Sequence, residues 1–259
     1  IEVLANLAPH ELLAAATPPP EQPDPLTPLR LVFASGTTAH KQAWQEELAP
    51  ALAVLLERNR SLRLDLLGHV QLPMQLLPFN HRIRCRPYAS YASYLRQLSC
   101  AQIGLVVLEP GTYTDAKSAI RWMEFSLLGL ASVLSPTATY AELLSPGEDV
   151  LFARGVDDWV HNVQRLIDDP DLRLCLARAA YAKALQRFQP AQADAFWQPL
   201  ITGSSPALPR RRRLLVINVF FAPQSIGGAT RVAQDQVLQL LQRAGDRYEV
   251  TVLLSLIHI

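Results

Sequence analysis

Short apolar runs alternate with longer amphipathic segments through residues 29–188, and this alternation constrains the fold more than any other feature of the sequence. Each short run is almost continuously apolar, as expected of a strand that is covered on both faces of a parallel sheet. The predicted strands are Leu29–Ala34, Leu62–Leu67, Ile83–Cys85, Ile103–Leu108, Ala131–Leu134 and Val150–Ala153.

The segments between these strands carry apolar residues three or four positions apart, which is the spacing of one helix face. Because crossovers between parallel strands are right-handed and usually helical, the order predicts an α/β fold. We expect one parallel sheet of about six strands in the order 3-2-1-4-5-6, with helices on both faces. The predicted helices span residues 41–59, 90–99, 115–129, 138–144, 156–168 and 170–188, and 191–200 fits a further one.

Proline-rich and small-residue stretches mark the predicted domain boundaries. We interpret residues 1–28 as a hinge and a proline-rich linker, 29–200 as the α/β domain, and 201–213 as a second linker. Residues 214–259 then repeat a strand, a helix and a strand. One such βαβ unit buries too little apolar surface to be stable alone. We therefore expect it to be the truncated start of another domain, packed separately from the first.

Charge and cysteine content exclude several function classes. The chain has 24 Lys and Arg residues against 23 Asp and Glu, so no overall basic field favours a nucleic-acid partner. Cys85, Cys100 and Cys175 are widely spaced and form neither a disulfide framework nor a metal-binding pair. No apolar run reaches the roughly 20 residues of a membrane-spanning helix. We expect a cytoplasmic protein with no membrane span and no resident metal or other cofactor.

The segment Ser35–Lys41 (SGTTAHK) joins the first predicted strand to the following helix. Ligands of open α/β sheets bind at the carboxyl ends of the strands, where the N–H groups that begin a helix can hold an anion. A turn with a glycine lets the backbone approach a phosphate closely. An ordinary turn with a Ser or Thr helix cap is the alternative, since the segment matches neither the dinucleotide fingerprint nor a P-loop.

The segment 114–124 (TDAKSAIRWME) carries the densest group of charged side chains. Lys117, Arg121 and Glu124 are four and three residues apart, so the predicted helix places them on one face. Cations are disfavoured at a helix start, and an anionic ligand there would remove the conflict. Lys117 could then reach a phosphate, and Glu124 could accept hydrogen bonds from sugar hydroxyls. The alternative is a solvated ion pair between Arg121 and Glu124.

Residues 29–188 resemble the carboxyl-terminal, nucleotide-sugar-binding domain of GT-B glycosyltransferases of the group-1 (family 4) type. Three stretches carry most of the resemblance. They are LRLVFASGTTAHKQAW at 29–44, DAKSAIRWMEFSLLGLASVLSP at 115–136, and LLSPGEDVLFARGVDDWVHNVQRLIDDPDLRLCLARAA at 143–180. The resemblance implies a Rossmann-like sheet and a nucleotide diphosphate sugar as the donor substrate, held without a metal.

The resemblance also implies roles for individual residues. Lys117 and nearby backbone N–H groups would hold the pyrophosphate, and Glu124 the ribose hydroxyls. The full set of donor-binding residues that we infer is Gly36, Thr37, His40, Lys41, Lys117, Ser118, Arg121 and Glu124. One departure concerns Ala116, with Asp115 beside it, because the family carries a Glu there that usually contacts the transferred sugar.

A second resemblance covers residues 213–237 (RLLVINVFFAPQSIGGATRVAQDQV), which look like the start of a GT-B amino-terminal domain. Together the two resemblances imply a fragment of a tandem glycosyltransferase. Such an enzyme transfers a sugar to a glycan or another hydroxyl acceptor with retention of the anomeric configuration. The acceptor-side domain would be missing, so the fragment is expected to be inactive alone. Because Ala116 replaces the first Glu, a non-catalytic nucleotide-sugar-binding or scaffold module is the alternative.

Overall fold

The computed structural model describes residues 6–24, 26–36, 40–87, 89–192, 212–218, 228–245 and 247–254. The chain divides into two compact units, one made of residues 11–186 and the other of residues 1–10 and 187–259. The boundaries predicted from the sequence at 28, 200 and 213 stay predictions, and residues 193–211 lie outside the described ranges. No helix within those ranges is long and apolar enough to span a membrane.

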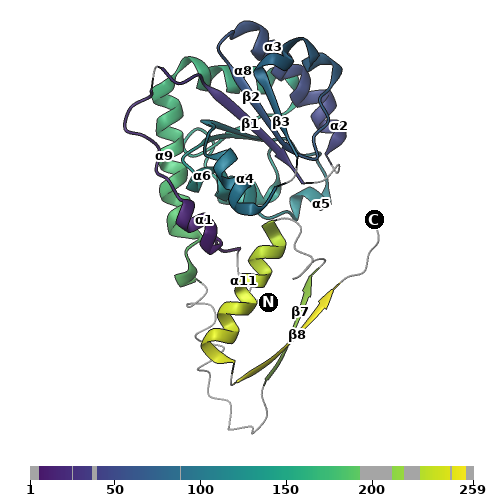
Figure 1. Ribbon diagram of the computed structural model, residues 1–259, viewed down its shortest axis with the longest axis vertical. Helices are drawn as coiled ribbons and strands as arrows, with labels where there is room; N and C mark the ends of the chain where they lie inside the picture. The colour runs from purple at the N-terminus through teal and green to yellow at the C-terminus, as the bar shows by residue number, and fades with distance from the viewer. Residues whose placement is uncertain are drawn as a thin grey trace. The chain divides into compact units, whose positions relative to one another are not determined.

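A six-stranded parallel sheet forms the centre of the larger unit, with the order β3-β2-β1-β4-β5-β6 (Figure 1). The predicted fold class and strand order are therefore confirmed. Every neighbouring pair is parallel. The strands are β1 (Arg30–Ser35), β2 (Arg63–Gly68), β3 (Ile83–Arg86), β4 (Ile103–Val106), β5 (Ala131–Leu134) and β6 (Leu151–Phe152).

Helices follow the strands as the sequence predicts, with some additions. A 3₁₀ helix over Met74–Arg82 and a short helix over His10–Ala15 were not predicted. The predicted helix 41–59 is one continuous helical stretch with a π-helical middle. The elements are α1 (His10–Ala15), α2 (Lys41–Ala43), η1 (Trp44–Leu48), α3 (Ala49–Arg58), η2 (Met74–Arg82), α4 (Tyr91–Leu98), α5 (Thr112–Asp115), α6 (Ile120–Leu127), α7 (Ala138–Leu143), α8 (Gly155–Asp168) and α9 (Pro170–Arg187).

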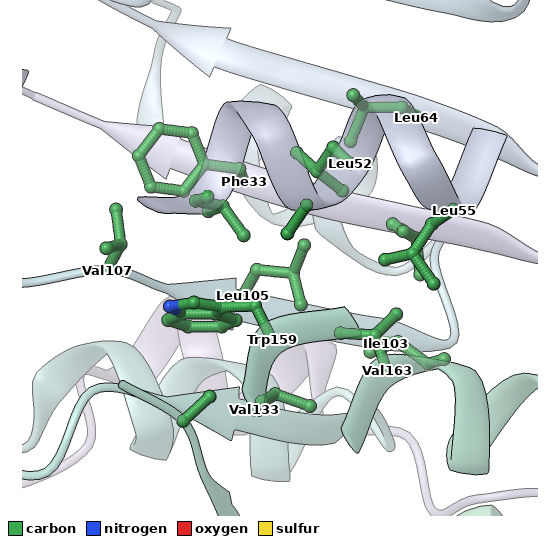
Figure 2. Close-up of a cluster of buried hydrophobic side chains, with 14 of the residues drawn as sticks. Phe33, Leu52, Leu55, Leu64, Ile103, Leu105, Val107, Val133, Trp159 and Val163 are labelled. Atoms are coloured by element: carbon green, nitrogen blue, oxygen red, sulfur yellow. The ribbon is translucent and has the colours of Figure 1, made fainter. Parts of the chain in front are cut away.

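One face of the sheet packs against α3 and α8, and Figure 2 shows the apolar side chains that fill this space. Since side chains alternate between the two faces of a strand, Ile103 and Leu105 point into this cluster while Gly104 points away. On the opposite face the ring of Phe125 from α6 lies against Gly104, where an added Cβ would stand 2.2 Å from the ring. The glycine therefore lets α6 approach β4 closely, and α6 carries two of the predicted site residues.

The prediction of one helix over residues 115–129 is wrong. The structure has two helices, α5 and α6, separated by a break at residues 116–119. The Asp115 carbonyl accepts a hydrogen bond from the Thr139 hydroxyl at 2.8 Å, and the Asp115 carboxylate accepts one from the Ala138 N–H at 2.9 Å. Asp115 therefore caps α7 and does not begin the helix that carries Glu124. Lys117 lies in the break, just before α6, and only Arg121 and Glu124 share a helical face.

The proline-rich segment that precedes β1 is attached to the larger unit at several points. The Thr17 N–H donates to the Leu127 carbonyl at 2.9 Å, at the end of α6. Gly129 has a φ of +78°, and an added Cβ would stand 2.8 Å from the Thr17 carbonyl oxygen. The Arg178 guanidinium on α9 donates to the carbonyls of Pro20 and Glu21. The glycine after α6 thus serves both the turn and the close approach of this segment.

The second unit contains a βαβ arrangement with its own two-stranded sheet. The strands β7 (Arg212–Asn218) and β8 (Tyr248–Leu254) pair in parallel, and α11 (Gly228–Ala244) lies between them in the chain. Among the described strands, β7 pairs with β8 alone. Leu240 and Tyr248 form a small buried cluster, whereas Leu238 remains 47% exposed. Residues 219–227, between β7 and α11, lie outside the described residues.

Candidate functional site

The carboxyl ends of β1 and β4, which are neighbours in the sheet, place two of the predicted site residues in contact. His40 lies four residues after the described part of the turn at Gly36, and Lys117 lies in the break before α6. The Lys117 Nζ is 2.5 Å from the His40 Nε2. The contact joins the end of the segment Ser35–Lys41 to the segment 114–124, the two segments that carry the predicted site residues. Two basic groups from distant segments meet at one point of the sheet edge.

The contacts of this pair do not accommodate a positive charge on both groups. The other ring nitrogen of His40, Nδ1, accepts the Glu109 N–H at 3.4 Å. A protonated ring carries a hydrogen on each nitrogen, so one would face the Glu109 N–H and the other the Lys117 ammonium. Burial lowers the pKa of His40, the Lys117 charge lowers this pKa further, and Glu109 opposes the shift. Burial also lowers the pKa of Lys117. A ligand with negative charge would stabilise the protonated forms of both groups.

Glu109, three residues after the end of β4, has a role that was not predicted from the sequence. Its carboxylate accepts the backbone N–H of Gln42 at 3.1 Å and that of Ala43 at 3.4 Å. These N–H groups lie at the start of the helix after β1, where the sequence analysis predicted that an anionic ligand would bind. Glu109 already accepts hydrogen bonds from both of them. The other basic side chains of the predicted site at this edge are His40, Lys41 and Lys117. The sequence did contain a signal for this contact, because Glu109 is an acidic residue that follows a predicted strand.

Arg121 and Glu124 form an ion pair with 2.8 Å between the guanidinium and Oε2. This is not the solvated ion pair considered as the alternative in the sequence analysis, because Glu124 is only 2% exposed. Tyr94 on α4 donates its hydroxyl to the same Oε2 at 3.1 Å, and the Arg121 guanidinium lies 5.3 Å from the centre of the Tyr94 ring. Burial raises the pKa of the neighbouring Tyr140, so its hydroxyl stays protonated. Glu124 is thus a buried carboxylate held by two side-chain donors.

A cavity of about 60 Å³ lies where the loops after β1 and β2 meet. The rings of Phe33 and Trp44 stack at 4.6 Å, and the Trp44 indole donates to the Gln71 carbonyl at 3.2 Å. Both rings are almost completely buried, so they form a rigid wall. The cavity is lined by Phe33, Ser35, His40, Lys41, Trp44, Gln45, His69, Val70 and Gln71. His40 therefore faces this cavity as well as contacting Lys117.

The other predicted site residues are distributed as follows. Gly36 is exposed, and an added Cβ would meet no atom within 4 Å. Lys41 is exposed at the start of α2, and Ser118 is exposed in the break before α6. Thr37 lies outside the described residues. Among the residues that the structure does describe, no group of three His, Cys, Asp or Glu side chains could hold a metal ion.

An open parallel sheet in the order 321456 defines a Rossmann-like domain. The chain belongs to the glycosyl transferase-like family, whose model matches residues 45–196. A search of curated proteins by sequence found no match.

Several solved structures share the fold. Anabaena HepE in complex with UDP has a TM-score of 0.53 at 16% identity, with 68% of this chain and 49% of that chain covered. HepE in complex with UDP-glucose has a TM-score of 0.52 at 15% identity, with 69% and 50% covered. An S. aureus TarM mutant, solved with fondaparinux, alpha-GlcNAc-glycerol and UDP, has a TM-score of 0.57 at 9% identity, with 73% and 38% covered. The chain spans about half the length of HepE and less of TarM.

Proposed function

We propose that the larger unit is the donor-binding half of a glycosyltransferase that takes a sugar from a nucleoside diphosphate sugar and transfers it, with retention, to an acceptor hydroxyl. The observation that carries the proposal is the contact between His40 and Lys117, two basic groups brought to one point of the sheet edge with their protonated forms destabilised. The HepE structures, solved with UDP and with UDP-glucose, support the choice of a nucleoside diphosphate.

The pyrophosphate is proposed to lie against His40, Lys41 and Lys117, with the backbone of Gly36, Thr37 and Ser118 as further donors. When the bond to the sugar breaks, negative charge grows on the leaving phosphate. Cations that are already in place stabilise this charge without a reorganisation of solvent. The site thereby needs no metal ion to assist the leaving group. Glu124, at 2% exposure beyond the first turn of α6, is proposed to accept the ribose hydroxyls.

A calorimetric titration of the 259-residue chain tests this proposal. UDP, GDP and ADP are titrated separately, each against the corresponding nucleoside as the control for binding without phosphate. At least one nucleoside diphosphate is expected to bind with a stoichiometry of one and clearly tighter than its nucleoside. Absence of binding by all three would overturn the proposal.

The pH dependence of nucleoside diphosphate binding follows from the lowered pKa of His40. The free protein holds His40 mostly neutral near pH 7, and a bound anion raises the pKa of His40, so binding takes up protons. By linkage, the affinity is expected to rise by about threefold to tenfold as the pH falls from about 8 to about 6.5. Titrations in buffers with different ionisation enthalpies measure the proton uptake. In His40→Asn the uptake should disappear, and an unchanged uptake would assign it to another group.

Transfer itself needs an acceptor held beside the donor. The acceptor is proposed to be a glycan or another hydroxyl compound that binds to a further domain, and residues 214–259 are proposed to begin a second such enzyme. The non-catalytic alternative is favoured by Ala116 and by the capping role of Asp115, which leave no carboxylate free at the position of the family's first Glu. Donor hydrolysis by the intact parent protein, measured beside that of the 259-residue chain, separates the two functions.

A further inference from the structure

The Tyr94 hydroxyl occupies one acceptor position on the Oε2 atom of Glu124, where a ligand hydroxyl could also bind. A carboxylate oxygen has two lone pairs, and both lone pairs of Glu124 Oε2 are in use. One accepts the Arg121 guanidinium at 2.8 Å, and the other accepts the Tyr94 hydroxyl at 3.1 Å. A further hydroxyl can therefore donate to Oε2 only if one of these two donors leaves.

Tyr94 is the donor that can be exchanged at lower cost. The Arg121 contact joins two opposite charges on one face of α6, and its loss would leave the buried Glu124 charge without its ionic partner, whereas the Tyr94 hydroxyl is neutral. The Tyr94 ring is half-buried on α4, and it stacks on Tyr91 with 6.0 Å between the ring centres. Moving it gives up this ring contact and the contact with Arg121, but it breaks no ion pair. A hydroxyl that replaces another hydroxyl on Oε2 keeps the buried carboxylate fully hydrogen-bonded.

We propose that the Tyr94 hydroxyl occupies, in the free protein, the position on Glu124 that a ribose hydroxyl takes in the complex. Tyr94 is then a specificity-determining residue. The ribose hydroxyl gains a hydrogen bond to Glu124 only by replacing that of Tyr94, so the strength of the Tyr94 bond limits the gain in affinity. A ligand without ribose hydroxyls leaves Tyr94 in place, whereas a ligand with them displaces it. The inference rests on the proposed binding of a nucleoside diphosphate and adds the exchange at Glu124.

The test compares UDP with 2′,3′-dideoxy-UDP on the wild-type chain and on Tyr94→Phe. The phenylalanine ring retains the packing against Arg121 and removes only the competing hydroxyl. In this variant the second lone pair of Oε2 is left without its protein donor, so a ribose hydroxyl gains more by binding there. UDP is expected to bind about threefold to tenfold tighter to Tyr94→Phe than to the wild type, the range for one net hydrogen bond. The affinity for dideoxy-UDP is expected to stay the same.

Tyr181→Phe is the matched control, because it removes a hydroxyl from another half-buried tyrosine, on α9. Neither ligand should distinguish it from the wild type. If Tyr94→Phe changes both affinities equally, or weakens UDP alone, the exchange is overturned while the proposed function stands. If the wild type binds no UDP, GDP or ADP, the proposed function fails and the exchange fails with it.

A second measurement keeps the proposal testable if Tyr94→Phe folds poorly. The ζ carbon of tyrosine is labelled with ¹³C in the wild-type chain, and the Tyr94 signal is identified as the one missing from Tyr94→Trp. UDP is expected to shift this signal, and dideoxy-UDP at saturation to leave it in place. Equal shifts with the two ligands would contradict the exchange.

Discussion

Replacing Lys117 with alanine is expected to weaken UDP binding by about 1–3 kcal/mol, which is roughly 5- to 150-fold, the range for a hydrogen bond to a charged group. Lys117 is half-buried and contacts His40 at 2.5 Å, so its ammonium acts in a place where water screens it less than at the surface. Without Lys117 the pKa of His40 is no longer lowered by the neighbouring charge. The loss in affinity should therefore be larger at about pH 8 than at about pH 6.5, where His40 replaces part of the missing charge.

Arg178→Ala is the control for the change in net charge. Its guanidinium binds the carbonyls of Pro20 and Glu21, away from the sheet edge that carries Lys117. Calorimetry should find its UDP affinity close to that of the wild type, apart from a small effect of net charge that added salt removes. If Lys117→Ala binds UDP as tightly as Arg178→Ala does, the pyrophosphate does not lie against Lys117.

Replacing Glu124 with alanine is expected to abolish the preference for UDP over 2′,3′-dideoxy-UDP while leaving the binding of pyrophosphate unchanged. The reason is that Glu124 supplies the proposed acceptor for the ribose hydroxyls, and Lys117 and His40 supply the phosphate contacts. The expected loss in UDP affinity is about 1–3 kcal/mol, as for the removal of a charged hydrogen-bond partner. Calorimetry with UDP, dideoxy-UDP and pyrophosphate on the same protein measures the three effects.

Because Glu124 is buried, its removal also leaves the Arg121 guanidinium without its carboxylate partner, so the melting temperature must be measured for each variant. Glu124→Gln retains the side-chain shape and the acceptor oxygen, and it should lose less stability and less ribose preference than Glu124→Ala. A Glu124→Ala protein that melts as a folded domain and still prefers UDP over dideoxy-UDP would exclude Glu124 as the ribose acceptor.

The sheet could be predicted from the sequence because each strand is encoded by its own residues. Runs such as Ile103–Val106 and Ala131–Leu134 hold no charged residue and a single polar one, Ser132, and both are completely buried in the structure. The alternation with helices, together with the right hand of the crossovers, leaves few ways to order the strands. The family resemblance, and not this pattern, placed His40 and Lys117 in one predicted site, and the structure brings the two side chains into contact beyond the carboxyl ends of β1 and β4.

The details of the site depended on contacts between residues far apart in the chain, and no local pattern encodes such contacts. Asp115 ends a helix because its carbonyl binds the hydroxyl of Thr139, which is 24 residues away. Glu109 occupies the helix start after β1 across a separation of 67 residues. Tyr94 reaches Glu124 from another helix, 30 residues away. Local propensity and apolar spacing thus determined which elements form and in what order. Only tertiary packing decided which donor pairs with which acceptor, because each buried polar group forms a hydrogen bond with a partner that the fold brings within reach.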